Sequence, residues 1–150
     1  MRQLPLGVQL GVSMRFETYH EGANGAVVAG LTQLVRDPGH APLWVLGPAG
    51  VGKTHLLQAS CALAGQRGLT SAYLPLASSK DLVPGLLAGL EQVDFVALDD
   101  VDAIAGQPAW EQALFTLYNE LLDLGGRLAC SAQLPPAGVA FALPDLASRL

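Results

Sequence analysis

A lysine and a threonine stand directly after a glycine-rich turn, in a pattern that can hold the phosphates of a nucleotide. The turn reads Gly47-Pro48-Ala49-Gly50-Val51-Gly52-Lys53-Thr54. Glycines let successive backbone N–H groups point at phosphate oxygens, and the start of a helix adds partial positive charge. Lys53 would reach the β and γ phosphates, Thr54 would hold Mg²⁺, and His55 completes the predicted site at the helix start. The spacing therefore predicts a site for a nucleotide and its magnesium ion.

The residues on either side of this turn supply the strand and the helix that the pattern needs. An apolar run, 42–46, leads into it, and residues 53–65 have the character of a helix. The alternative is an ordinary glycine-rich turn, since the chain contains 17 glycines. The two flanks favour phosphate binding.

A pair of acids forms the second chemical landmark. The apolar residues 95–98 run directly into Asp99 and Asp100, which is typical of a buried parallel strand. Ligands bind beyond the carboxyl ends of such strands. Asp99 would orient water on Mg²⁺, and Asp100 would position or activate the attacking water. An acidic turn is the alternative, but the upstream turn favours a Walker B motif.

Strands and helices alternate along the rest of the chain, which predicts an α/β fold with a parallel sheet. Helices are expected over 26–35, 82–90 and 109–122. Asn24 would cap the first of these helices, and Asp81 would cap the second. Expected strands cover 70–76, with Pro75 at a sheet edge, and 127–132, which ends beside the acids. Apolar residues at helical spacing in 109–122 are expected to be core residues.

Length and charge narrow the possible functions. The 150 residues suit one domain, and the net charge of −5 provides no basic stripe for direct DNA binding. The cysteines Cys61 and Cys130 are expected to be buried and reduced. The three histidines share no ligand spacing with them, which argues against a metal site built from these side chains. No apolar stretch approaches ~18 residues, so a cytoplasmic protein is expected.

Residues 1–14 are expected to be a flexible tail. The run that begins at Gln3 resembles the short peptide that many bacterial replication and repair proteins insert into the cleft of the sliding clamp. Gln3 would supply amide hydrogen bonds, and Leu4 and Leu6 would fill the hydrophobic pocket. A disordered leader without a partner is the alternative. The resemblance makes the tail a candidate clamp-binding peptide.

The order of strand, P-loop, Walker B motif and polar strand tip resembles the initiator-type AAA+ ATPases, and within them the DnaA/Hda family. The residues that carry the resemblance are Gln3-Leu4-Pro5-Leu6, His55-Leu56-Leu57-Gln58-Ala59, Ala109-Trp110-Glu111 with Phe115, Leu117, Tyr118 and Asn119, and Leu143-Pro144-Asp145-Leu146-Ala147-Ser148-Arg149-Leu150. The resemblance implies a three-layer P-loop AAA+ core with a parallel sheet. Residues 15–150 would form a partial nucleotide-binding domain that lacks the last core strand and the C-terminal helical lid.

The same resemblance implies further roles and partners. Arg149 would be an arginine finger offered to a neighbouring subunit, and Ser131 and Gln133 would be sensor-1 candidates. The cofactors would be ADP or ATP with Mg²⁺. The partners would be DnaA and the β subunit of DNA polymerase III, the sliding clamp, with DNA reached only through the clamp and a homo-oligomer possible.

The resemblance predicts an adaptor that promotes hydrolysis of DnaA-bound ATP and so limits replication initiation. Whether the chain uses ATP hydrolysis of its own stays open. A DnaA-like initiator or helicase-loader ATPase and a stand-alone P-loop NTPase or kinase also remain open.

Overall fold

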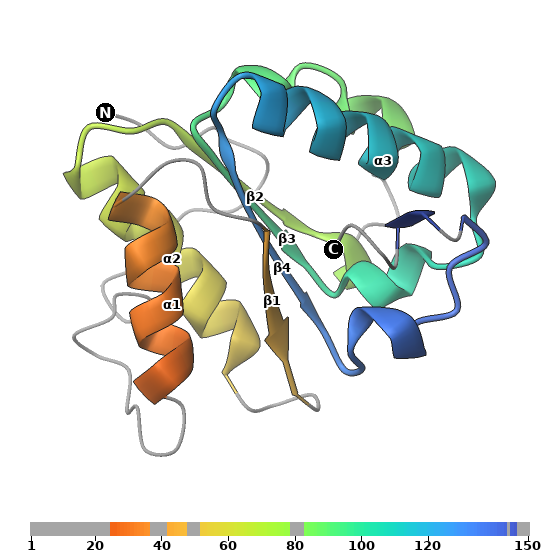
Figure 1. The fold of residues 1–150 in the computed structure, drawn as a ribbon, viewed down its shortest axis with the longest axis horizontal. Coiled ribbons are helices and arrows are strands. Elements are labelled where there is room, and N and C mark those ends of the chain that lie inside the picture. The colour runs from red at the N-terminus through yellow and green to blue at the C-terminus, as the bar shows by residue number, and fades with distance from the viewer. Residues whose placement is uncertain (1–24, 37–41, 48–51, 79–82, 144, 147–150) are drawn as a thin grey trace.

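The computed structural model describes residues 25–36, 42–47, 52–78, 83–143 and 145–146. Four parallel strands form one sheet in the order β1-β4-β3-β2. They are β1 (Leu43–Leu46), β2 (Ser71–Pro75), β3 (Phe95–Asp99) and β4 (Arg127–Ala132). Helices α1 (Gly25–Arg36) and α2 (Lys53–Gln66) cover one face, and α3 (Pro108–Asp123) covers the other (Figure 1). The three-layer α/β fold predicted from the sequence is confirmed.

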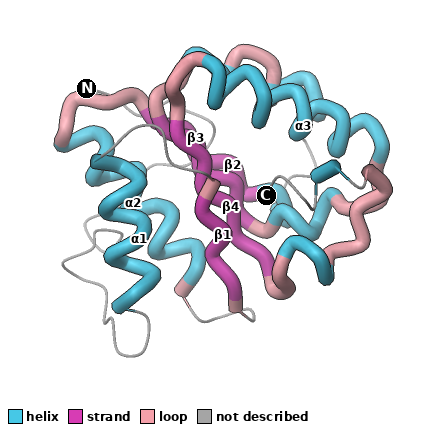
Figure 2. Tube along the Cα trace, viewed as in Figure 1, coloured by secondary structure: helices cyan, strands magenta, loops and turns pink. Residues whose placement is uncertain are grey.

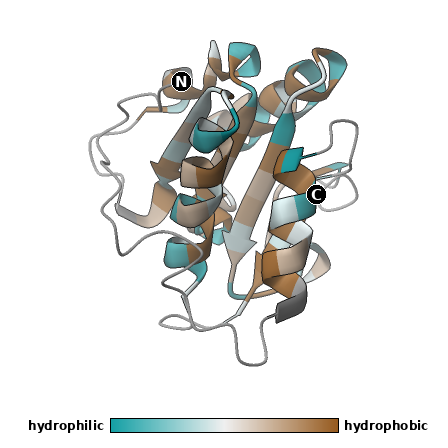
Figure 3. Ribbon diagram, turned by 90° about the vertical axis from the view of Figure 1, so that its left-hand side faces the viewer, coloured by the Kyte–Doolittle hydropathy of each residue, from teal (hydrophilic) through white to brown (hydrophobic). Residues whose placement is uncertain are grey.

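Successive residues of each strand face opposite sides of the sheet, and both sides are buried. On β3, Phe95 and Ala97 pack in the apolar cluster with α1 and α2, whereas Val96 and Leu98 pack in the cluster with α3. A continuous apolar run is the signature of such a strand. The covering helices carry both hydrophilic and hydrophobic residues, as Figure 3 shows. Because Asp99 continues the odd-numbered series, it lies on the α2 side.

The segment between β2 and β3 differs from the predicted helix over 82–90. Two short 3₁₀ turns replace it, Pro84–Leu87 and Leu90–Gln92. Gly89 separates them with a left-handed backbone, φ 97°, which ends any regular right-handed helix. The prediction of an α-helix here was wrong because the apolar spacing outweighed the glycines, which favour turns.

Other predictions about the core are confirmed. Cys61 and Cys130 are buried and free, and burial raises the pKa of each thiol to about 12. Four of the α3 side chains expected from helical spacing are buried, namely Trp110, Leu114, Leu117 and Leu121, whereas the expected Tyr118 and Leu122 are half-buried. None of the helices that the structure describes is long and apolar enough to cross a membrane.

One carboxylate lies inside the α3 layer. Glu111 is fully buried and accepts three backbone hydrogen bonds, from Gly106 at 2.6 Å, Ala142 at 2.9 Å and Leu143 at 2.7 Å. Burial by itself raises the pKa of Glu111, but the three N–H donors outweigh it and leave the pKa below its ordinary value. Glu111 therefore ties the start of α3 to the segment at 142–143.

Glu111→Gln is expected to destabilise the fold by about 2–4 kcal/mol, because the amide sets an N–H₂ group against backbone donors. The lowered pKa means that this carboxylate stabilises the fold above its unfolded pKa near 4.5 and loses that effect as the pH falls through the folded pKa. Urea denaturation should therefore show a difference from wild type that narrows in acid. Glu120→Gln, an exposed change on the same helix, is the control and should have little effect. A loss that is equal at all pH values would contradict this account.

Candidate nucleotide-binding site

The carboxyl ends of the strands and the amino end of α2 meet at one edge of the sheet (Figure 2). Gly47 follows β1 and donates its N–H to the carbonyl of Ala132 at the end of β4, at 3.1 Å. Gly52 adopts a left-handed backbone, φ 92°, immediately before α2. A glycine suits this position because other residues are strained there. This edge is where the sequence predicts phosphate binding.

Asp99 is the centre of a buried hydrogen-bond network at this edge. Its Oδ2 accepts from the hydroxyl of Thr54 at 2.5 Å and from that of Tyr73 at 2.6 Å, and its Oδ1 accepts from Ser131. The side chain is only 2% exposed. Three hydroxyl donors, from α2, β2 and β4, thus offset the cost of burying the carboxylate.

Asp100 follows with an uncommon backbone conformation. Its φ of 56° is left-handed, and it is the only residue other than glycine with positive φ in the part of the chain described here. Ser131 Oγ accepts the Asp100 N–H at 2.8 Å, so one hydroxyl fixes both acids. Burial raises the pKa of Asp100, the charge of Asp99 raises it further, and Lys53 opposes both. Strain and an altered pKa together are typical of a functional carboxylate.

Lys53 contributes a buried cation. The residue is 5% exposed, and its Nζ donates to the carbonyl of Gly47 at 2.5 Å. This contact holds the ammonium group across the turn whose inner residues, 48–51, lie outside the described part of the chain. An ammonium group, a hydroxyl and a carboxylate at one helix start fit a phosphate with magnesium, since Mg²⁺ prefers oxygen ligands and often keeps several waters.

The structure brings together most of the predicted site residues that it describes. Hydrogen bonds link Thr54, Asp99, Asp100 and Ser131 to one another. Lys53 precedes Thr54 and acts on Asp100 through its charge, and half-buried His55 follows in α2. Gln133 is exposed, and only its backbone N–H is recorded in a hydrogen bond, to Asp102 at 3.2 Å. Of the two sensor-1 candidates, Ser131 is the one that contacts Asp99. The predictions for Gln3, Leu4, Leu6, 48–51 and Arg149 fall outside the described residues.

Tyr73 belongs to the site but was missed from the sequence. It lies on β2, and burial raises the pKa of its phenol, which the hydrogen bond to Asp99 and the charge of Asp99 raise further. The hydroxyl therefore stays protonated and donates at neutral pH. No local sequence signal marked it, because its proximity to Asp99 depends on the pairing of β2 with β3.

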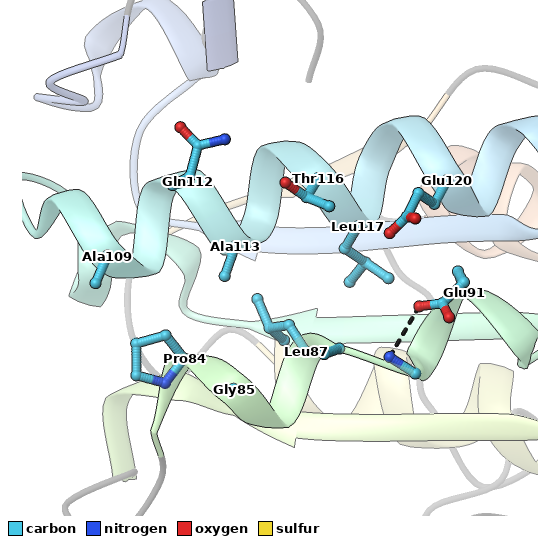
Figure 4. Close-up of a pocket in the computed structure, with 12 residues that line it drawn as sticks. Pro84, Gly85, Leu87, Glu91, Ala109, Gln112, Ala113, Thr116, Leu117 and Glu120 are labelled. Carbon is cyan, nitrogen blue, oxygen red and sulfur yellow. Dashed lines mark hydrogen bonds between the residues drawn. The ribbon is translucent and has the colours of Figure 1, made fainter.

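A hollow of about 500 Å³ lies on the α3 side of the sheet, between α3 and the two 3₁₀ turns (Figure 4). Its lining residues include Leu87, Ala113 and Leu117, with the carboxylates of Glu91 and Glu120 toward one end. None of the described residues that line it is a lysine or an arginine, whereas the Lys53 edge carries a buried ammonium group. The Lys53 edge is therefore the better candidate for phosphate.

A comparison with protein-family models finds no match. Solved structures do match. DnaA from Aquifex aeolicus bound to AMPPCP aligns with a TM-score of 0.82 and 24% identity over 93% of this chain and 48% of that chain. Domain III of DnaA from Thermotoga maritima aligns with a TM-score of 0.81 and 26% identity over 95% of this chain and 65% of that chain. The chain has a DnaA-like AAA+ core.

A helicase loader, DnaC, is also similar, with a TM-score of 0.64 and 16% identity over 93% of this chain and 88% of that chain. The chain spans about half the length of the first solved structures that it matches. These matches support the fold of the core, and the P-loop and Walker B assignments stay predictions.

Asp100→Asn is expected to stabilise the protein without nucleotide by about 0.5 kcal/mol at pH 7, after allowance for solvent screening. The change removes a charge that lies beside Asp99 and keeps a residue type that tolerates left-handed backbone. The pKa of Asp100 is raised in the folded protein, so the ionised wild-type carboxylate lowers the stability of the fold as the pH rises through that pKa. The difference between variant and wild type should therefore shrink in acid. Urea denaturation at neutral and acid pH measures the difference. A variant less stable than wild type at pH 7 would contradict this interpretation.

Proposed function

We propose that the chain binds an adenine nucleotide with Mg²⁺ at the Lys53 edge and acts as a regulator of the DnaA type in replication initiation. The observation that carries the nucleotide site is the Asp99 network, which joins the P-loop threonine to the paired acids. The similar DnaA structure with bound AMPPCP supports an adenine nucleotide. The functional class rests on the DnaA-like core together with the sequence motifs.

In this proposal each residue of the site has a defined task. Lys53 neutralises phosphate charge, and Thr54 and Asp99 hold the magnesium ion, which supplies positive charge against the phosphates when bound. Asp100 positions or activates the attacking water. Ser131 keeps the two acids in register through its two hydrogen bonds.

The finer role that we propose is regulatory inactivation of DnaA. Gln3, Leu4 and Leu6 dock on the DNA-loaded sliding clamp, and the AAA+ core contacts ATP-bound DnaA. Arg149 then offers its guanidinium to the nucleotide held by DnaA, since an arginine keeps its charge and contacts phosphate oxygens with two donors. DNA is reached through the clamp, in keeping with the net charge of −5.

A helicase-loader role is the second candidate, because DnaC shares the fold over most of its own length. Its sequence identity of 16% supports the fold alone. The clamp-like peptide favours the adaptor, and capture by the sliding clamp distinguishes the two.

Lys53→Ala is expected to weaken ADP binding in magnesium by about 10–100-fold, because a buried charge-assisted contact is lost. Isothermal titration calorimetry measures the affinity. Arg67→Ala removes an exposed cation from the other end of α2 and should leave binding unchanged. Equal affinity of both variants, or a wild type that shows no binding, would remove the basis of the proposal.

Two variants should separate docking from stimulation in a DnaA–ATP turnover assay with clamp and DNA. Gln3→Ala/Leu6→Ala should lose both clamp capture and stimulation, because the anchors of the peptide are removed. Arg149→Ala should keep clamp capture and ADP binding but lose about 10³-fold in stimulated turnover. Gln9→Ala, in the same tail, is the control for the peptide. Stimulation that survives Arg149→Ala would rule out the finger, and capture that survives the double change would rule out the peptide.

A further inference from the structure

The hydroxyl of Tyr73 is a contact of Asp99 that neither the P-loop nor the Walker B motif includes. We propose that Tyr73 is a positioning residue, which holds the Asp99 carboxylate in the orientation that magnesium requires. The inference rests on the proposed nucleotide site and adds a residue from a strand outside both motifs.

The register of the sheet explains why a long side chain is needed. Pro75 is the β2 residue paired with Asp99, and it carries no hydrogen-bond donor. Tyr73 is paired with Ala97, two positions earlier on the same face. Two residues of a strand span about 6.6 Å, so only a long side chain can reach from there to the carboxylate. The phenol does so, with its hydroxyl 2.6 Å from Oδ2.

The packing of the ring fixes the position of the hydroxyl. Tyr73 is 2% exposed and belongs to the apolar cluster that contains Leu57, Cys61 and Phe95. A ring packed in this way has little freedom, because protein interiors are close-packed. Tyr73 is therefore a rigid donor from β2, on the side of Asp99 opposite β4 in the sheet.

The number of acceptor sites on the carboxylate gives the contact a consequence for metal binding. A carboxylate offers about four lone-pair sites, and three are engaged by Thr54, Tyr73 and Ser131. One site is left for a water of the magnesium ion. Oδ2 accepts from Thr54, which is a proposed magnesium ligand, and from Tyr73, which is not. Without its hydroxyl, Oδ2 keeps only Thr54, and the carboxylate is less well oriented.

The test is the magnesium dependence of ADP binding, measured by calorimetry in EDTA and at magnesium concentrations from micromolar to millimolar. Tyr73→Phe removes the hydroxyl and keeps the ring. The magnesium concentration for half-maximal enhancement should rise about tenfold, the scale seen when a residue that orients a metal ligand is lost. ADP affinity in EDTA should stay at the wild-type value, because the phosphate contacts of Lys53 are unchanged.

Tyr118→Phe, the same chemical change on α3 across the sheet, is the matched control and should leave the magnesium dependence unaltered. Tyr73→Met removes the donor but retains an apolar side chain, and it replaces the first variant if Phe prevents folding. An unchanged magnesium requirement in the folded variant would overturn the inference. A loss of ADP affinity that is as large in EDTA as in magnesium would overturn it too. Failure of the wild type to bind ADP under any condition would overturn the proposed function, and this inference with it.

Discussion

The candidate site depends on one buried carboxylate that must be satisfied from several directions. Asp99 lies at the end of a strand whose two faces are covered, so it cannot keep a shell of water. Burying an ionised carboxylate is costly unless donors replace that water. The donors come from α2, β2 and β4, and the relative placement of these elements is therefore tied to the site.

Much of this arrangement could be predicted from the sequence because it follows from local rules. The apolar run before Asp99 indicated a strand buried on both faces, and the glycine-rich turn between an apolar run and a helix indicated the P-loop. The strand at 127–132 was predicted with the bounds that the structure has. Parallel strands bring their carboxyl ends to one edge, so the end of this strand was expected to lie beside the acids. The hydrogen bond between Ser131 and Asp99 is consistent with that expectation.

Features that depend on contacts distant in the sequence could not be predicted in the same way. The role of Tyr73 depends on the pairing of β2 with β3 and on Pro75 having no donor, neither of which is a local pattern. Glu111 reads as an ordinary helical glutamate, yet it accepts N–H groups from residues on both sides of it in the chain. In the segment before β3, Leu87 and Leu90 pack in the core, while the left-handed backbone of Gly89 interrupts the predicted helix.

The segment from Asp100 to Gly106 joins the two buried carboxylates. Ser131 holds its first residue through the Asp100 N–H, and Glu111 holds its last through the Gly106 N–H. Because Glu111 also binds the backbone at 142–143, the paired acids are linked by packed, hydrogen-bonded structure to the chain that leads toward Arg149. The placement of the paired acids is thus tied to the placement of α3, which carries Glu111.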